Sequence, residues 1–207
     1  TYGPELAWRE LDALLSQRER IRGLDLAGDE AHYPGEWFEP HFKRAREAGW
    51  HITAHAGEAD GPRSIWQALN GLGAERIGHA VRAPEDPALM DWLAEKQIGI
   101  EVSLTSNVQT TTVSSYVSHP LRLFMQRGLR ASLNSDDPGI SGITLRHEYE
   151  IAAPAAGLDE VMIRQAQRNA LEMAFLTPDE RAALLQECAG RSAPPRNACS
   201  IDSSGVV

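Results

Sequence analysis

The sequence predicts an α/β fold in which parallel strands alternate with helices. Five short apolar runs recur along the 207-residue chain, and their starts lie about 20 to 30 residues apart, the length of one strand-plus-helix unit. Several of the segments between these runs have helical periodicity. Alternation of this kind indicates a parallel sheet with helices outside it. A closed (β/α)₈ barrel needs eight units, so five units indicate either a smaller open sheet or a barrel without its three N-terminal units.

Each expected strand is a short apolar run that ends at polar or turn-forming residues. The five runs cover residues 23–27, 50–54, 76–79, 98–104 and 129–133. Helices are expected where apolar residues recur every three to four positions, as in a segment that begins with Pro62, a residue favoured in the first helical turn. This spacing predicts helices over residues 4–22, 62–72, 86–96, 120–127, 144–156 and 159–175, and a capping box at 177–180 begins another.

The C-terminal end of the chain has a different composition. Residues 190–207 are rich in Ser, Pro, Ala and Asn and show no periodicity. We therefore expect residues 1–189 to form the folded portion and residues 190–207 to form a disordered tail. The chain starts at Thr1 and not at Met, which suggests that an N-terminal part is missing.

Composition excludes several classes of protein. The net charge is −9 and the basic residues are scattered, which argues against nucleic acid as a partner. No apolar run approaches the roughly 20 residues of a membrane span, and no secretory signal opens the chain. The two cysteines, Cys188 and Cys199, form no disulfide framework, so a reduced, cytoplasmic setting is expected.

Polar residues follow every expected strand, at the point where a loop begins. In parallel α/β folds the carboxyl ends of the strands carry the active site. Five consecutive strand ends of this kind form a stronger signal than any single motif among them. The residues concerned are Gly28 to Glu30, His55 to Glu58, His79, Ser106 with Asn107, and Asp136 with Asp137.

Three of these side chains suit hydrolytic chemistry at a metal. A neutral imidazole at His55 is a natural ligand for Zn²⁺, although a lone strand-end histidine is more often structural. Glu58 can act as an acid if its carboxyl group stays protonated in a dry site; alternatively it is an ordinary first-turn residue. His79 follows Gly78 and could orient or deprotonate a metal-bound water, or be a satisfied core histidine. His51 lies roughly 13 Å from His55 along a strand, so we expect it to be structural.

The two adjacent carboxylates complete the candidate site. Asp136 and Asp137 repel each other unless a cation or a ligand donor is present, so one facing a metal and one facing a substrate would resolve the cost. The alternative is an exposed Asp-Asp-Pro turn. Ser106 and Asn107 are expected to shape the pocket by hydrogen bonding. Catalytic zinc usually has three protein ligands, and the sequence offers only His55 and Asp136 as good candidates, with no His-x-His pair.

Five motifs in register resemble the adenosine deaminase family, and the resemblance extends over roughly residues 4–187. They are LDLAGDE (24–30), HAGE (55–58), RIGH (76–79), SLTSN (103–107) and SLNSDDPG (132–139), and the segments HEYEIAAPAAGL and RQAQRNALEMAFL resemble the bacterial enzymes especially. The resemblance implies a (β/α)₈ barrel with one Zn²⁺, of which this chain would hold strands 4–8. It also implies hydrolytic deamination of adenosine and 2′-deoxyadenosine to inosine and ammonia.

Motif by motif, the resemblance implies a role for six residues. His55 and Asp136 would be zinc ligands, Glu58 would donate a proton to purine N1, and His79 would assist the metal-bound water. Asp137 would hydrogen-bond purine N7, and the backbone of Gly28 would meet the N3 edge. The chemistry would be attack of a zinc-activated water on C6 and loss of ammonia.

Two departures from the family pattern qualify this expectation. The His-x-His of the first strand is absent, so the isolated chain is expected to be inactive. The residue after His79 is Ala80 where the family usually has Gly, a small change that we expect to be tolerated. Within the family, adenine deaminases are the close competitor, and they usually carry Asp before the His of the third motif and Ala after Asp-Asp-Pro. This chain has Gly78 and Gly139 at these positions, which favours the nucleoside branch. A non-catalytic fragment and a different metal-dependent amidohydrolase also stay open.

Overall fold

The computed structural model describes residues 3–191, and the chain divides into two compact units. Of the described residues, 3–175 form the first unit, which contains the whole sheet, and 176–191 belong to the second. Within the described residues the second unit contains one helix, α11 (Pro178–Arg191). None of the helices in residues 3–191 is long and apolar enough to cross a bilayer.

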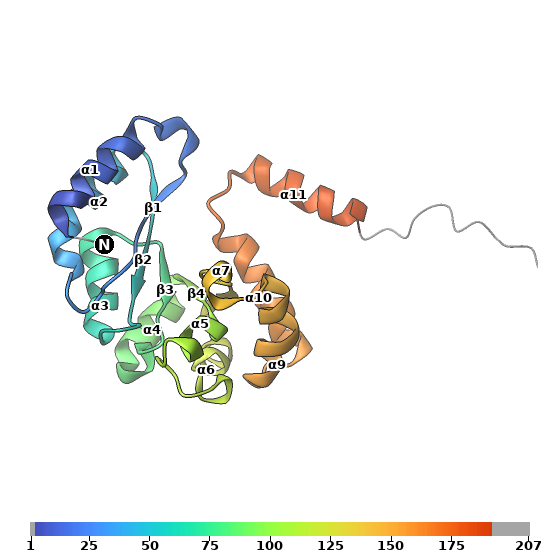
Figure 1. The fold of residues 1–207 in the computed structure, drawn as a ribbon. Coiled ribbons are helices and arrows are strands. Elements are labelled where there is room, and N and C mark those ends of the chain that lie inside the picture. The colour runs from blue at the N-terminus through green and yellow to red at the C-terminus, as the bar shows by residue number, and fades with distance from the viewer. Residues whose placement is uncertain (1–2, 192–207) are drawn as a thin grey trace, which may run out of the picture. The chain divides into compact units, whose positions relative to one another are not determined.

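The first unit is built on a parallel sheet whose strands are ordered as they occur in the sequence (Figure 1). Each strand pairs in parallel with the next. Crossovers between parallel strands are right-handed in nearly all proteins. When they always move in the same direction through a sheet, they place the connecting helices on one face, which is the winding of a barrel. The sheet confirms the expected α/β class with five parallel strands. They are β1 (Gly23–Leu26), β2 (His51–Ala56), β3 (Arg76–His79), β4 (Gly99–Val102) and β5 (Arg130–Leu133).

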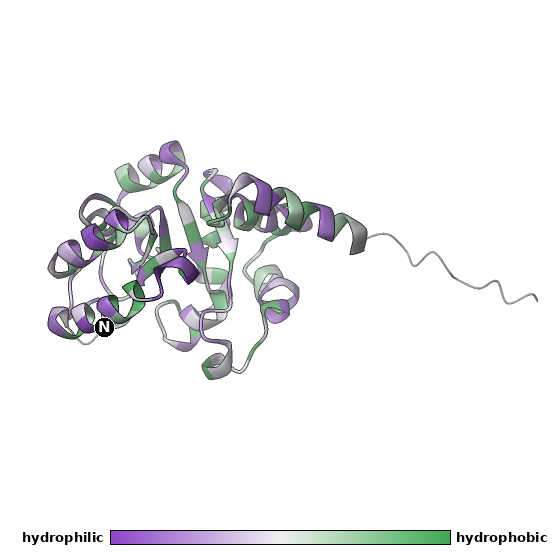
Figure 2. Ribbon diagram, turned by 90° about the horizontal axis from the view of Figure 1, so that it is seen from above, coloured by the Kyte–Doolittle hydropathy of each residue, from purple (hydrophilic) through white to green (hydrophobic). Residues whose placement is uncertain are grey.

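The two faces of the sheet differ in polarity because side chains alternate along each strand. The face under the helices is apolar: Ile52, Ile77 and Ile100 are at most 1% exposed. The opposite face carries polar residues, and there Thr53 Oγ1 donates a hydrogen bond to Glu101 at 2.9 Å. Figure 2 shows hydrophobic and hydrophilic residues mixed along the central strands and along the helices around them. The sheet therefore leaves a polar face available for chemistry.

Helices form the outer layer of the first unit (Figure 1). Helix α10 packs beside β5, where Asn169 donates a hydrogen bond to the carbonyl of Ala131 at 2.8 Å. The α-helices are α1 (Pro4–Leu15), α2 (Glu39–Glu47), α3 (Pro62–Gln67), α4 (Pro87–Lys96), α5 (Leu104–Gln109), α6 (Leu121–Gln126), α7 (Pro138–Ser141), α8 (Leu145–His147), α9 (Ala153–Ala155) and α10 (Glu160–Met173). Two segments are π-helical: η3 (Ala68–Leu72) extends α3, and η6 (Glu148–Ala152) connects α8 to α9. The short 3₁₀ turns are η1 (Arg18–Arg20), η2 (Gly35–Phe38), η4 (Ala83–Glu85) and η5 (Tyr116–Ser118).

Several predicted boundaries were wrong. The first helix ends at Leu15 and not at residue 22. Directly after Leu15, Ser16 Oγ donates a hydrogen bond to the carbonyl of Ala13, and a side-chain hydrogen bond of this kind competes with the continuation of the helix. The fourth strand ends at Val102, and the next residues enter α5, a helix that the sequence did not predict. Helix α2 was not predicted either.

The C-terminal predictions have mixed outcomes. The capping box is confirmed, because Thr177 N donates to Glu180 Oε2 at 2.8 Å and Glu180 N donates to Thr177 Oγ1 at 3.2 Å. The predicted tail begins at residue 190, but helix α11 continues to Arg191. Residues 192–207, the rest of that predicted tail, lie outside the described residues.

We predict that the isolated chain associates with itself. In the described part of the chain, β1 lies at one edge of the sheet and β5 at the other, and an open edge presents unpaired backbone groups to other chains. Leu24 and Leu26 of β1 are only half-buried. Size-exclusion chromatography with light scattering should show dimers or larger species, and a soluble monomer at high concentration would contradict the prediction.

Candidate metal and active site

Strands β2 and β3 bring two histidines together. His55 pairs in register with Gly78, and His79 is one residue further along β3. The two ring centroids lie 4.9 Å apart. A Cβ atom on residue 78 would lie 3.3 Å from Cγ and Nδ1 of His55, so glycine at this position allows the His55 ring to lie against β3.

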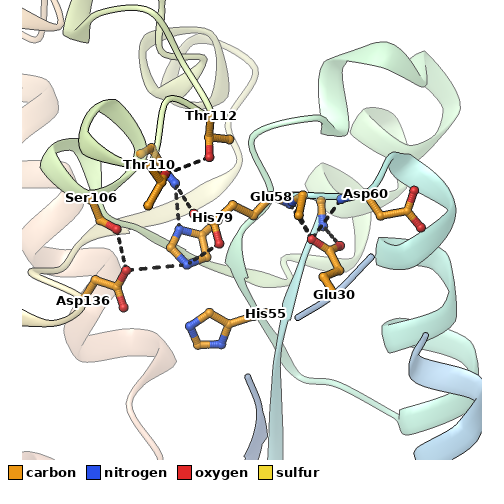
Figure 3. Close-up of polar contacts among 12 residues, drawn as sticks. Glu30, His55, Glu58, Asp60, His79, Ser106, Thr110, Thr112 and Asp136 are labelled. Carbon is orange, nitrogen blue, oxygen red and sulfur yellow. Dashed lines mark hydrogen bonds and ion pairs between the residues drawn. The ribbon is translucent and has the colours of Figure 1, made fainter. Parts of the chain in front are cut away.

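Asp136 joins the two histidines from the loop after β5. Its backbone has φ 53°, a left-handed conformation that is uncommon for a residue other than glycine. Ser106 Oγ donates a hydrogen bond to Asp136 Oδ2 at 2.7 Å, and this oxygen lies 3.9 Å from His79 Nε2. His55, His79 and Asp136 each offer a ligand atom, and these atoms lie within 4.8 Å of one another (Figure 3). The cluster therefore has the donors and the spacing that a metal ion requires.

Glu58 lies at the same place, in the loop that follows β2 (Figure 3). Its Oε2 is 3.5 Å from His79 Nε2, and its Oε1 accepts a hydrogen bond from Asn107 Nδ2 at 3.0 Å. Asn107 Nδ2 also lies 3.0 Å from His79 Nδ1. Both Ser106 and Asn107 thus make hydrogen bonds to the candidate site residues, as expected.

Glu30 holds the loop that carries Glu58. Its carboxylate accepts hydrogen bonds from the backbone N–H groups of residues 57, 58, 59 and 60, at 2.6, 3.1, 2.6 and 3.1 Å, and from Ser64 Oγ. Charge-assisted hydrogen bonds of this kind are stronger than neutral ones. The sequence placed Glu30 at a strand end but gave it no role, since nothing local shows that the loop of another strand folds around it.

We predict that Glu30→Gln destabilises the protein by about 1.5–3 kcal/mol, because a neutral amide replaces a carboxylate that accepts several hydrogen bonds and turns an NH₂ group toward other donors. Urea unfolding followed by circular dichroism measures the change. Glu36→Gln is the matched control, because Glu36 is exposed and lies 3.9 Å from Arg63, so its loss should change stability by less than about 0.5 kcal/mol. Equal unfolding midpoints for the two variants would contradict the prediction.

Asp25 is a further functional candidate that the sequence reasoning missed. Its Oδ2 lies 3.0 Å from Nδ1 of His55, the arrangement in which a carboxylate orients a metal-ligating histidine. Burial lowers the pKa of His55, but Asp25, together with the charges of Asp136 and Glu58, outweighs burial and raises the pKa to about 9. A charged residue in the middle of the apolar run 23–27 was the signal that could have identified it.

Three more residues that the sequence analysis named are Gly28, Asp137 and Ala80. Gly28, with φ 119°, lines a pocket together with His55 and Glu30. Asp137 is exposed at the N-terminus of α7, where its side chain makes no capping hydrogen bond. Ala80 has φ 51°, a conformation that glycine adopts without strain, which explains why a glycine is favoured there.

The fold and the cluster together define a class of protein. A parallel α/β sheet wound like a barrel carries imidazole and carboxylate groups at the carboxyl ends of its strands, which is where barrel enzymes have their active sites. Nitrogen and oxygen donors at this spacing fit Zn²⁺. The class is therefore that of barrel proteins with a candidate catalytic metal site.

Comparison with known proteins identifies the family. Residues 2–190 match the model of the adenosine deaminase family, so the chain belongs to this family. It is 59% identical over 191 residues to adenosine deaminases of Escherichia coli strains, a match that covers 92% of this chain and 57% of the relative. The chain thus spans somewhat more than half the length of the curated relatives that it matches.

Solved structures of related proteins have the same fold. An adenine deaminase from Arthrobacter aurescens is 30% identical, with a TM-score of 0.85, and the match covers 92% of this chain and 58% of that one. A zinc-bound amidohydrolase from Burkholderia ambifaria is 26% identical, with a TM-score of 0.82, covering 91% of this chain and 53% of that one. An N6-mAMP deaminase from Arabidopsis is 27% identical, with a TM-score of 0.78, covering 91% and 56%.

Proposed function

We propose that this chain supplies catalytic residues for the zinc-dependent hydrolytic deamination of adenosine and 2′-deoxyadenosine to inosine or deoxyinosine and ammonia. The observation that supports it most is the meeting of Glu58, His79, His55 and Asp136 at one place, with Glu58 Oε2 3.5 Å from His79 Nε2. These residues come from three separate strand ends. Membership of the adenosine deaminase family favours this reaction over other hydrolyses.

The residues would divide the reaction among them. His55 and Asp136 would hold Zn²⁺, and Asp25 would orient the His55 ring from behind. The ion, when bound, supplies a water activated for attack at neutral pH. Glu58 would donate its proton to N1 of the purine as the oxygen of water bonds to C6. The proton of the new C6 hydroxyl then passes to the amino group, and the C6–N bond breaks to release ammonia. The other proton of the water restores Glu58, so one water and one adenosine give inosine and ammonia.

Two further residues would position the base. Asp137, exposed at the start of α7, would hydrogen-bond N7 of the purine. The backbone of Gly28, in the pocket beside His55, would meet the N3 edge. Both roles come from the family motifs, and the exposed carboxylate of Asp137 is free to face a substrate. A cytoplasmic setting, expected from the cysteine usage, stays a prediction.

Adenine is the competing substrate, since a related structure is an adenine deaminase. The identity with the adenosine deaminases is higher, at 59% against 30%, and Gly78 and Gly139 favour the nucleoside. A non-catalytic role of this chain is a second possibility. An assay of deamination with both substrates separates these possibilities.

The test measures deamination by two proteins. One is the 207-residue chain, and the other is the chain fused behind the N-terminal part of an Escherichia coli relative, which carries the His-x-His pair expected of the family. Each is loaded with Zn²⁺ and assayed by the absorbance change of adenosine and, separately, of adenine. We expect the chain alone to be inactive and the fusion to deaminate adenosine in preference to adenine. Activity of the chain alone would contradict the ligand argument, and preference for adenine would contradict the substrate.

A further inference from the structure

A buried chain of hydrogen bonds leads from the backbone of α6 to the candidate site. The N–H group of Leu121 donates to His119 Nδ1 at 3.0 Å, and His119 Nε2 lies 3.2 Å from Asn107 Oδ1. Asn107 Nδ2 lies 3.0 Å from both Glu58 Oε1 and His79 Nδ1. His119, Asn107 and His79 are at most 3% exposed, so these groups satisfy one another.

The first link fixes the proton on His119. A backbone N–H can only donate, so Nδ1 of His119 must accept and carries no proton. Burial lowers the pKa of His119 to about 3, so the ring is neutral and its one proton lies on Nε2. That nitrogen therefore donates to Asn107, which must turn its oxygen toward His119.

The second link fixes the proton on His79. With its oxygen toward His119, Asn107 turns its NH₂ group toward Glu58 and His79, and this group can only donate. The carboxylate oxygen of Glu58 accepts one hydrogen, and Nδ1 of His79 accepts the other. A neutral His79 ring then carries its proton on Nε2, the nitrogen 3.5 Å from Glu58 Oε2 and 3.9 Å from Asp136 Oδ2.

We propose that His119 and Asn107 are positioning residues that hold His79 as the Nε2–H tautomer, so that His79 presents a hydrogen-bond donor to the site. Two consequences follow. His79 does not ligate a metal through Nε2, although its position would allow this. In the proposed deamination, on which this part of the inference rests, its N–H holds the oxygen of the attacking water and takes no proton from it.

The tautomer can be measured directly in the metal-free protein. Long-range ¹H–¹⁵N NMR correlations of the imidazole rings show which nitrogen is protonated, and His79→Gln identifies the signals of His79. Two internal references are present. His41 Nε2 lies 2.8 Å from the carbonyl oxygen of Pro4, so Nε2 must be protonated in His41. His51 Nδ1 lies 2.9 Å from Glu75 Oε2, so Nδ1 must be protonated in His51. We expect His79 to show the His41 pattern, and protonation on Nδ1 would overturn the proposal.

Three variants test the origin of the tautomer. Asn107→Asp replaces the donor with an acceptor of the same shape, so the proton of His79 should appear on Nδ1. His119→Phe removes the donor that orients Asn107, and both tautomers of His79 should appear. His119→Gln keeps an N–H group that can reach Asn107 and should keep the Nε2–H form. An unchanged His79 signal in both Asn107→Asp and His119→Phe would show that the two residues do not position it.

Kinetics separate this inference from the proposed function. In a protein that deaminates adenosine, His119→Phe should lower kcat at least tenfold with KM changed less than threefold, and His119→Gln should restore most of kcat. A wild-type protein with the Nε2–H tautomer but no deaminase activity would refute the proposed function and leave the tautomer assignment standing. An active protein with the proton of His79 on Nδ1 would refute the tautomer assignment and leave the proposed function standing.

Discussion

Glu58→Gln is expected to lower the turnover of adenosine by about 10²–10⁴-fold, the range that a positioned general acid contributes. Glutamine has the size of glutamate, and its amide oxygen can still accept the hydrogen bond that Asn107 Nδ2 gives to Glu58 Oε1 at 3.0 Å. It has no acidic proton for purine N1. The loop and the metal ligands should therefore stay in place while the reaction stops. The measurement is kcat by absorbance in the fused protein, with zinc content by inductively coupled plasma mass spectrometry.

The matched control for Glu58→Gln is Glu85→Gln. Glu85 is exposed and pairs with Arg82, with Arg82 Nε 2.7 Å from Glu85 Oε1, outside the cluster. This variant should keep both zinc and turnover. Full turnover in Glu58→Gln would refute the assignment of Glu58 as the acid, whereas loss of zinc along with turnover would show that the residue supports the metal site instead.

His55→Ala is expected to abolish both zinc binding and turnover, because it removes one of the two ligands proposed in this chain and leaves Asp136 without its partner. Catalytic zinc sites generally use three or more protein ligands. Zinc content and kcat are measured as for Glu58→Gln. The control is His51→Ala, four residues earlier on the same strand, where His51 Nδ1 lies 2.9 Å from Glu75. Zinc retained by His55→Ala would refute the ligand assignment.

The raised pKa of His55 adds a dependence on pH. Asp25, Asp136 and Glu58 outweigh burial and hold the pKa of His55 at about 9, so below pH 9 a proton must leave the ring before a metal can bind. Zinc affinity should therefore rise about tenfold per pH unit between pH 6 and 9 as far as this group controls it. Competition with a chelator at several pH values measures the slope. In Asp25→Asn the pKa should fall, and the slope should disappear above neutral pH.

The same shift affects the stability of the metal-free protein, and its sign follows from linkage. The pKa of His55 is higher in the folded protein than the ordinary value of 6.5, so the folded state binds this proton more tightly than the unfolded chain does. The stabilisation is fully present below pH 6.5 and is lost as the pH rises through about 9. Unfolding of the metal-free protein by urea at pH 6 and pH 9 should show this decrease, and bound zinc should remove it.

Much of the sheet could be predicted from the sequence because its signals are local. Apolar runs such as residues 76–79 alternate with amphipathic helices, and the period of each segment depends only on neighbouring residues. The carboxyl ends of parallel strands lie at one edge of a sheet by geometry alone. The positions of His55, His79 and Asp136 near one another therefore followed from the fold class. The capping box at 177–180 was equally local and was found.

Tertiary contacts decided what no local pattern encodes. Helix α5 begins where a strand was expected because the N–H groups of Leu104 and Thr105 donate at 3.1 Å to the fully buried carboxylate of Glu148, more than 40 residues away. Burial raises the pKa of Glu148 and these hydrogen bonds lower it; burial has the larger effect, so the pKa is raised overall. A helix of only six residues is marginal without such support, so the sequence of α5 by itself could not predict it.

The sequence by itself determined the order of the strands, the side of the sheet on which chemistry is possible, and the kinds of side chain present there. The tertiary structure decided how those side chains are held: Asp25 behind His55, Glu30 under the loop of Glu58, and His119 behind Asn107. The physical reason is that a hydrogen bond depends on positions within about 3 Å, and partners that lie far apart in the chain reach those positions only when the sheet and its helices are assembled.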